Sequence, residues 1–131
     1  MMKRYINYSI AYAVLAMIGG VFYREFTKMN DYTAWTTLSV VHTHYFILGM
    51  LFFLVLGVVS TRVHFKSNRA VLFYNMGLNL TAIMLVVRGI VQALDLNVVS
   101  AFISGVAGVG HILLGISLVM ILLDIKKSCI K

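Results

Sequence analysis

The chain has 131 residues, of which 61% are hydrophobic and 11% are charged, and its formal net charge is +7. So apolar a composition lies outside the range of soluble domains and indicates an integral membrane protein with a single domain, residues 1–131. The excess of basic residues does not indicate a nucleic-acid partner. The lysines and arginines gather at the ends of apolar runs, where they orient membrane helices.

Four apolar segments follow one another along the chain. They span approximately residues 6–23, 36–61, 70–94 and 98–125. Each has the length that crosses a membrane core, about 20 residues at 1.5 Å per residue. The polar connections between them are short, and short connections make neighbouring helices antiparallel. The sequence therefore predicts an all-α, integral membrane, up-down-up-down four-helix bundle.

The distribution of basic residues predicts the orientation of this bundle. The first connection holds only Arg24 and Lys28. The termini and the second connection hold most of the others, namely Lys3, Arg4, Arg62, Lys66, Arg69, Lys126, Lys127 and Lys131. Because basic residues favour the cytoplasmic side, we expect both termini to be cytoplasmic.

The first apolar segment carries small residues at Ala13, Ala16, Gly19 and Gly20. Small side chains let the backbone of a neighbouring helix approach closely. This stretch is therefore expected to be a helix contact.

The second segment contains two histidines, His42 and His44. An imidazole in hydrocarbon must find a protein partner, a water-filled cavity or a metal. Residues two apart point about 200° from each other on a helix, so only one of the two faces the bundle centre squarely. Gly49 and Gly57 share the face of His42, which favours His42 as the interior residue. Depth in the membrane favours His44 over His42 instead, because His44 lies nearer the level of the histidine in the fourth segment.

The third segment holds two asparagines and an arginine. Asn75 and Asn79 are expected to form hydrogen bonds between helices. Arg88 lies in the same outer half of the bundle as the histidines of the second segment, where a guanidinium is costly unless it snorkels or pairs. Snorkelling to lipid phosphate and pairing with a bound carboxylate both remain open.

The fourth segment carries Ser104, Gly108, His111 and Gly115 on one helical face. The small residues leave a hollow around the imidazole, with room for something flat. Together with the histidines of the second segment, this predicts a haem with axial ligands His42 and His111. His44 is the alternate ligand or a supporting partner.

These strings also resemble known families. Val41-His42-Thr43-His44 followed by Leu48-Gly49 resembles the haem-ligand helix of haem-copper oxidase subunit I. Four helices with histidines on the second and fourth resemble one half of haem A synthase, and the whole chain resembles a small uncharacterised family of four-helix membrane proteins in Gram-positive bacteria. The oxidase resemblance places its ligand on His42, and the synthase layout places the partner on His111. The resemblance implies a multi-pass protein of the bacterial cytoplasmic membrane.

The predicted function is a haem b protein with bis-histidine ligation, for electron transfer or for haem or gas sensing. The chain has no nucleophile–base pair, paired carboxylates or phosphate loop for hydrolytic or transfer chemistry, and it lacks the oxidase copper-site cluster and the synthase glutamate. The predicted cofactor-binding residues are His42, His44, His111, Arg88, Gly49, Gly108 and Gly115. The expected partners are membrane lipid and haem, with a quinone, a redox protein or a second copy of the chain as further candidates.

An alternative of another class needs no haem. In that reading His42, His44 and His111 bind Cu or Zn, for which three imidazoles suffice, or they bind nothing. The bundle is then a small structural or regulatory subunit.

Overall fold

The structure is a computed structural model that describes residues 1–64, 68–97 and 100–129. Every regular element in these ranges is helical, so the all-α prediction is confirmed. The elements are α1 (Met2–Met29), η1 (Thr37–Val40), α2 (Val41–His44), η2 (Tyr45–Leu51), α3 (Phe52–Val59), α4 (Asn68–Ala93) and α5 (Ser100–Cys129). Because η1, α2, η2 and α3 join into one continuous second helix, these ranges contain 4 helices long and apolar enough to span a membrane.

Helices α1 and α5 are longer than the apolar segments that predict them, whereas the second helix, Thr37–Val59, is slightly shorter than the predicted 36–61. Helix α1 continues well past its apolar window to Met29, and α5 reaches Cys129. An apolar window measures the thickness of hydrocarbon, whereas backbone hydrogen bonding continues into polar residues beyond it. The predicted start of the fourth helix at residue 98 lies outside the described residues, as do Lys66 and Lys131 of the charge count.

The second helix changes its winding along its length. It opens as the 3₁₀ segment η1, passes through α2 and widens into the π-helical segment η2. Within η2, the carbonyl of Leu48 accepts a hydrogen bond from Tyr74 Oη at 2.7 Å, and that of Met50 accepts one from Ser9 Oγ at 2.9 Å. In an apolar environment, irregular winding persists where neighbouring side chains satisfy the backbone groups that it frees. Hydroxyl groups from α1 and α4 therefore stabilise the wide turn.

The start of the second helix is fixed to the end of α4. Thr36 Oγ1 donates to the carbonyl of Gly89 at 3.0 Å, and Thr37 Oγ1 donates to that of Leu85 at 2.8 Å. The backbone N–H of Thr37 donates to Gln92 Oε1 at 2.9 Å. The first turn of the helix, whose donors lack intrahelical partners, is thus held by α4.

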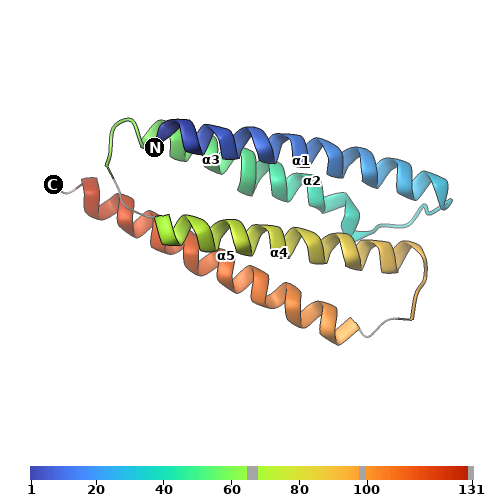
Figure 1. Ribbon diagram of the computed structural model, residues 1–131. Coiled ribbons are helices and arrows are strands. Elements are labelled where there is room, and N and C mark those ends of the chain that lie inside the picture. The colour runs from blue at the N-terminus through green and yellow to red at the C-terminus, as the bar shows by residue number, and fades with distance from the viewer. Residues whose placement is uncertain (65–67, 98–99, 130–131) are drawn as a thin grey trace.

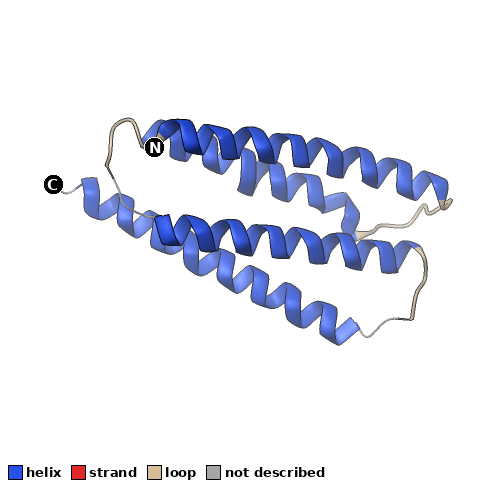
Figure 2. Cartoon of the chain, viewed as in Figure 1, coloured by secondary structure: helices blue, strands red, loops and turns tan. Residues whose placement is uncertain are grey.

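Successive helices run antiparallel, and both termini lie at the same end of the bundle (Figure 1). The loops are confined to the two ends (Figure 2). Helix α1 packs along the second helix, and α5 packs along α4. In the part of the chain that the structure describes, α5 packs extensively on α4 alone. The bundle is therefore built from two hairpins, joined chiefly between the second helix and α4.

Helices α4 and α5 approach each other closely at two glycines. A Cβ on Gly77 would lie 2.6 Å from the backbone nitrogen of Leu114, and a Cβ on Gly110 would lie 2.8 Å from Thr81 Oγ1. Neither position has room for a side chain. Small residues set the spacing of this pair, as they commonly do between membrane helices.

Candidate functional site

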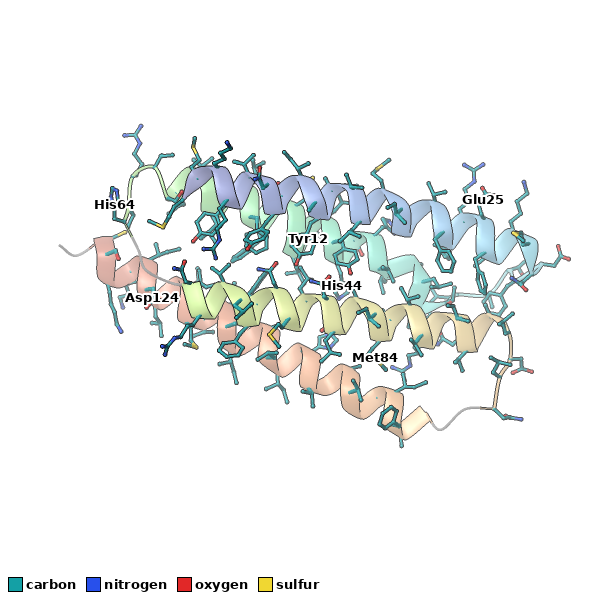
Figure 3. The ribbon with its side chains drawn as sticks, in the orientation of Figure 1. Tyr12, Glu25, His44, His64, Met84 and Asp124 are labelled. Atoms are coloured by element: carbon teal, nitrogen blue, oxygen red, sulfur yellow. The ribbon has the colours of Figure 1, made fainter. Side chains whose placement is uncertain are left out.

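Two histidines from different hairpins meet midway along the bundle. His44 ends α2 and His111 belongs to α5, and their ring centroids are 6.4 Å apart with the ring planes at 89°. Figure 3 places His44 between the two ends of the bundle, well away from His64 at one end and Glu25 at the other. The pair therefore lies at the level of the apolar side chains.

Both imidazoles are held in the same way. His44 Nδ1 is 2.8 Å from the carbonyl oxygen of Val40, and His111 Nδ1 is 2.8 Å from that of Ala107. A carbonyl oxygen can only accept, so each contact assigns the proton to Nδ1 and leaves the lone pair on Nε2. Neither Nε2 has a hydrogen-bond partner among the described residues. A backbone carbonyl bound to one ring nitrogen is the usual support for a histidine that ligates a metal through the other.

The distance between the two ring centroids can be compared with that expected for two imidazoles on one metal ion. A metal–imidazole bond is about 2.0 Å and the ring centre lies roughly 1.1 Å beyond the nitrogen, so opposite imidazoles have centroids roughly 6 Å apart. Tetrahedral bonds of the same length would bring the centroids to roughly 5 Å. The 6.4 Å between the centroids of His44 and His111 is closer to the value for opposite ligands, the arrangement of the two axial positions of a haem iron.

The face of α5 that carries His111 is open. Gly108 and Gly115 lie one turn to either side of His111, and a Cβ at either position would meet no atom within 4 Å. A hollow of about 260 Å³ adjoins His44 on the second helix, between Thr43 and Leu48. Each of the two imidazoles therefore has unoccupied space beside it.

His42 lies on another face of the second helix. Its Cβ and Cγ are 3.7 and 3.8 Å from the place of a Cβ on Gly20, so this side chain packs toward α1. On the same face, a Cβ on Gly49 would lie 2.6 Å from Tyr12 Cβ. The glycine face is therefore packed, as predicted, but what it packs against is α1. His42 Nδ1 is buried and has no hydrogen-bond partner among the described residues.

The histidines do not form a three-ligand cluster. In the described ranges, no group of three or more His, Cys, Asp or Glu side chains is placed to hold a metal ion. Protein zinc sites usually have at least three side-chain ligands, whereas a haem iron takes four of its ligands from the porphyrin and needs only two from the chain. The pair His44 and His111 has the ligand count of the second kind of site.

Arg88 lies toward the end of the bundle opposite the termini. Its Nη2 donates to Ser104 Oγ at 3.3 Å, and its side chain is otherwise exposed. The ion pair found among the described residues joins Arg24 to Glu25, so Arg88 has no acidic partner there. Ser104 shares the helical face of His111 and lies two turns away, roughly 10 Å along the axis. A guanidinium is thus available to an anionic group that extends from the histidine pair.

The hydrogen-bond partners of the two asparagines were not anticipated from the sequence. Tyr12 Oη donates to Asn75 Oδ1 at 2.5 Å, and Tyr45 Oη donates to Asn79 Oδ1 at 3.1 Å. The prediction of hydrogen bonds between helices is therefore confirmed. The signal for the partners was the presence of two tyrosines in the interior of apolar segments, where a hydroxyl needs a polar partner.

The fold and the histidine pair define a class, a four-helix protein of candidate membrane spans with two imidazole rings 6.4 Å apart between its hairpins. Within that class the chain belongs to the family described as "Protein of unknown function (DUF2871)", which matches residues 2–128. No curated protein and no solved structure matches the chain. The resemblance to haem-copper oxidase subunit I and haem A synthase stays a prediction, because the comparisons show no link to either.

Proposed function

We propose that the protein binds haem b in a membrane through His44 and His111 and that it transfers electrons. The observation that supports this proposal is the pair of imidazoles 6.4 Å apart, each with Nδ1 on a backbone carbonyl and Nε2 free. His44 replaces His42 as the preferred ligand because His42 packs toward α1. Two axial histidines leave no open coordination position on the iron, which suits electron transfer better than gas binding.

The open face of α5 supports the same proposal. The porphyrin would lie against Gly108 and Gly115, where no side chain occupies the space. Its propionates would reach toward Arg88, whose fork of donors matches a carboxylate with two parallel hydrogen bonds. The positive guanidinium and the negative propionate are each costly in an apolar environment, and pairing them lowers that cost. Desolvation of the two groups removes much of the electrostatic gain.

The proposed location is the bacterial cytoplasmic membrane, with both termini cytoplasmic. Support comes from the basic residues at the end of the bundle that carries the termini, namely Lys3, Arg4, Arg62, Arg69, Lys126 and Lys127. The single cysteine, Cys129, is exposed and provides a native probe of sidedness. A membrane-impermeant thiol reagent should label Cys129 in inverted vesicles and leave it unlabelled in intact spheroplasts. The reverse pattern would contradict this orientation.

The test of haem binding is a spectrum of the full chain, purified in detergent from haem-replete cells. We expect a Soret band, about one iron per chain and a reduced spectrum that carbon monoxide does not change. His44→Ala and His111→Ala should each abolish the six-coordinate spectrum. His42→Ala, two positions away in the same helix, is the matched control and should retain it.

Other outcomes discriminate between the alternatives. Copper or zinc without a Soret band would replace haem with the metal site of the second hypothesis, and no metal at all would favour a structural or regulatory subunit. A shift with carbon monoxide would indicate an open coordination position and favour sensing. Loss of haem in His42→Ala but not in His44→Ala would return the ligand to His42.

A further inference from the structure

A second cavity lies between α1 and α4, away from the open face of α5. It has a volume of about 310 Å³, within the range of small-ligand sites, roughly 300–1,000 Å³. Tyr8 and Tyr12 line it from α1, Asn75 and Asn79 line it from α4, and Arg4 lies at one end. The remaining wall is alanine and leucine. Such a cavity is apolar over most of its surface and has a few polar groups in fixed positions.

The polar groups on its wall are joined in one network. Tyr12 Oη donates to Asn75 Oδ1 at 2.5 Å and accepts from Asn79 Nδ2 at 2.9 Å. Asn79 Nδ2 also donates to the carbonyl of Asn75 at 2.8 Å, so both of its amide protons are used. Asn75 Nδ2 donates only to the carbonyl of Val71, at 2.8 Å. One amide proton of Asn75 is therefore unused among the described residues.

The hydroxyl of Tyr8 is a second unused donor. Its ring packs against Phe53, with centroids 5.1 Å apart, and lies 5.6 Å from the guanidinium carbon of Arg4. No hydrogen bond joins its hydroxyl to another residue in the described part of the chain. A donor in an apolar environment without an acceptor is costly. The cavity thus presents two donors that bind no acceptor among the described residues.

Two donors at two levels of the cavity would be satisfied by one ligand with two acceptors. The backbones of Tyr8 and Tyr12 are one helical turn apart, about 6 Å, and Asn75 is bound to Tyr12. Two carbonyl oxygens on opposite corners of a six-membered ring are roughly 5 Å apart. A flat ring with two such carbonyls could accept from both donors at once. Because α1 and α4 do not pack along each other in the described ranges, an apolar tail could leave sideways between them.

We propose that this cavity binds the head group of a membrane-soluble quinone, with Asn75 and Tyr8 as hydrogen-bond donors to its two carbonyls. A phospholipid fits less well. Its phosphate would pair with Arg4, which already donates to Asn68 Oδ1 at 3.0 Å, and its acyl chains would then cover the polar network. The site is separate from the histidine pair and does not require haem to be bound.

The test is direct binding of a short-chain azidoquinone to the full chain, measured by photolabelling in detergent and by mass spectrometry of the labelled peptides. We expect saturable labelling of the peptides that contain Tyr8 and Asn75, which an unlabelled short-chain quinone displaces. Tyr8→Phe removes a hydroxyl that bonds no described residue, so it should leave folding unchanged and raise the Kd roughly fivefold, the effect of one lost hydrogen bond. Asn75→Leu should raise the Kd further, unless it fails to fold.

The matched control is Asn7→Leu, an exposed residue of α1 next to Tyr8 that does not line the cavity. It should bind like the natural chain. The proposal is overturned if labelling does not saturate, if it falls on other peptides, if Tyr8→Phe binds unchanged, or if anionic phospholipid displaces the probe and quinone does not. Protein from haem-deficient cells should bind equally well. If protein from haem-replete cells binds the probe but shows no Soret band, this cavity is supported and the haem proposal is contradicted.

Discussion

Two faces of one helix carry one histidine each, and their surroundings are opposite. The face of His42 packs on α1, where a Cβ on Gly49 would collide with the ring of Tyr12. The face of His44 looks toward His111, where a Cβ on Gly108 or Gly115 would meet nothing within 4 Å. Glycine near a histidine thus has two meanings in this protein, a close helix contact on one side and free space on the other.

This difference separates stability from binding. A substitution on a packed face should act on the folded structure, whereas one on the open face should act only on what binds there. The residue type is the same in both places, so its neighbours decide which effect follows.

The largest effect is expected at the packed contact between α4 and α5. In Gly77→Val, even the Cβ would lie 2.6 Å from the nitrogen and 2.9 Å from the Cα of Leu114. Backbone atoms cannot step aside, so we expect a loss of more than about 3 kcal/mol and little folded protein. Gly105→Val is the control, because that position is open. The measurement is the yield of monodisperse protein and its thermal unfolding. A normal yield and Tm for Gly77→Val would contradict the close approach.

The next effect concerns haem alone. Gly115→Leu adds a side chain to the open face next to His111, so we expect the Tm to stay within a few degrees while most haem is lost. Gly105→Leu is equally open but lies on another face of α5, and it should keep its haem. The haem-to-protein ratio and the Tm measure the two effects separately. Full haem in Gly115→Leu would place the cofactor elsewhere.

A moderate effect is expected from Tyr12→Phe, which removes hydrogen bonds on the packed side without creating a steric clash. The change removes one partner from both Asn75 and Asn79. We expect a loss of about 1–2 kcal/mol in the free energy of unfolding, measured by denaturant titration in mixed micelles. Tyr8→Phe, whose hydroxyl bonds no described residue, should cost almost nothing. Equal effects of the two variants would mean that the network contributes no stability.

A smaller effect is expected from Arg88, at the edge of the open side. Arg88→Leu should leave the protein abundant, weaken haem retention and lower the reduction potential by a few tens of millivolts. For one electron, about 59 mV corresponds to a tenfold change in the equilibrium constant of reduction. Arg88→Lys should restore the potential partly and retention less, because an ammonium supplies charge without the fork. Ser104→Ala is the control for the bond to Ser104. Unchanged haem retention and an unchanged reduction potential in Arg88→Leu would show that the guanidinium binds lipid phosphate instead.

The smallest effect is expected from His42→Leu. This change removes the buried Nδ1 that has no described partner and keeps an apolar side chain against α1. We expect an unchanged haem-to-protein ratio and equal or slightly higher stability, because an unpaired polar atom is lost. A Soret band that disappears in His42→Leu while the fold persists would assign the ligand to His42.

The sequence predicts those features that depend on local properties. Apolar length and short connections predict the four helices, because each can be read from one stretch of chain. The wide turn η2 cannot be read in this way, since it depends on hydroxyls of Ser9 and Tyr74 that arrive from two other helices.

The choice between the two histidines shows the same limit. Glycine periodicity correctly indicates that the face of His42 is packed, but it does not say whether a helix or a cofactor lies against it. Depth along the helix depends only on the rise per residue, and it favours His44, the histidine whose ring lies next to that of His111. Which residues contact each other across the bundle depends on the rotation of each helix, and a single sequence contains little information about that rotation.

Among the described residues, α5 packs extensively on α4 alone, and this has a consequence for biogenesis. A membrane chain is made from its N-terminus, and its earlier parts can fold while later parts are still being synthesised. By the time α5 is synthesised, the second helix and α4 are already complete, and the His44 ring can already bind the carbonyl of Val40. His111 is therefore the last of the two histidines to be synthesised, and it reaches the site when the other ring is already oriented. Capture of a ligand between the two would therefore act as a checkpoint on the final step of assembly.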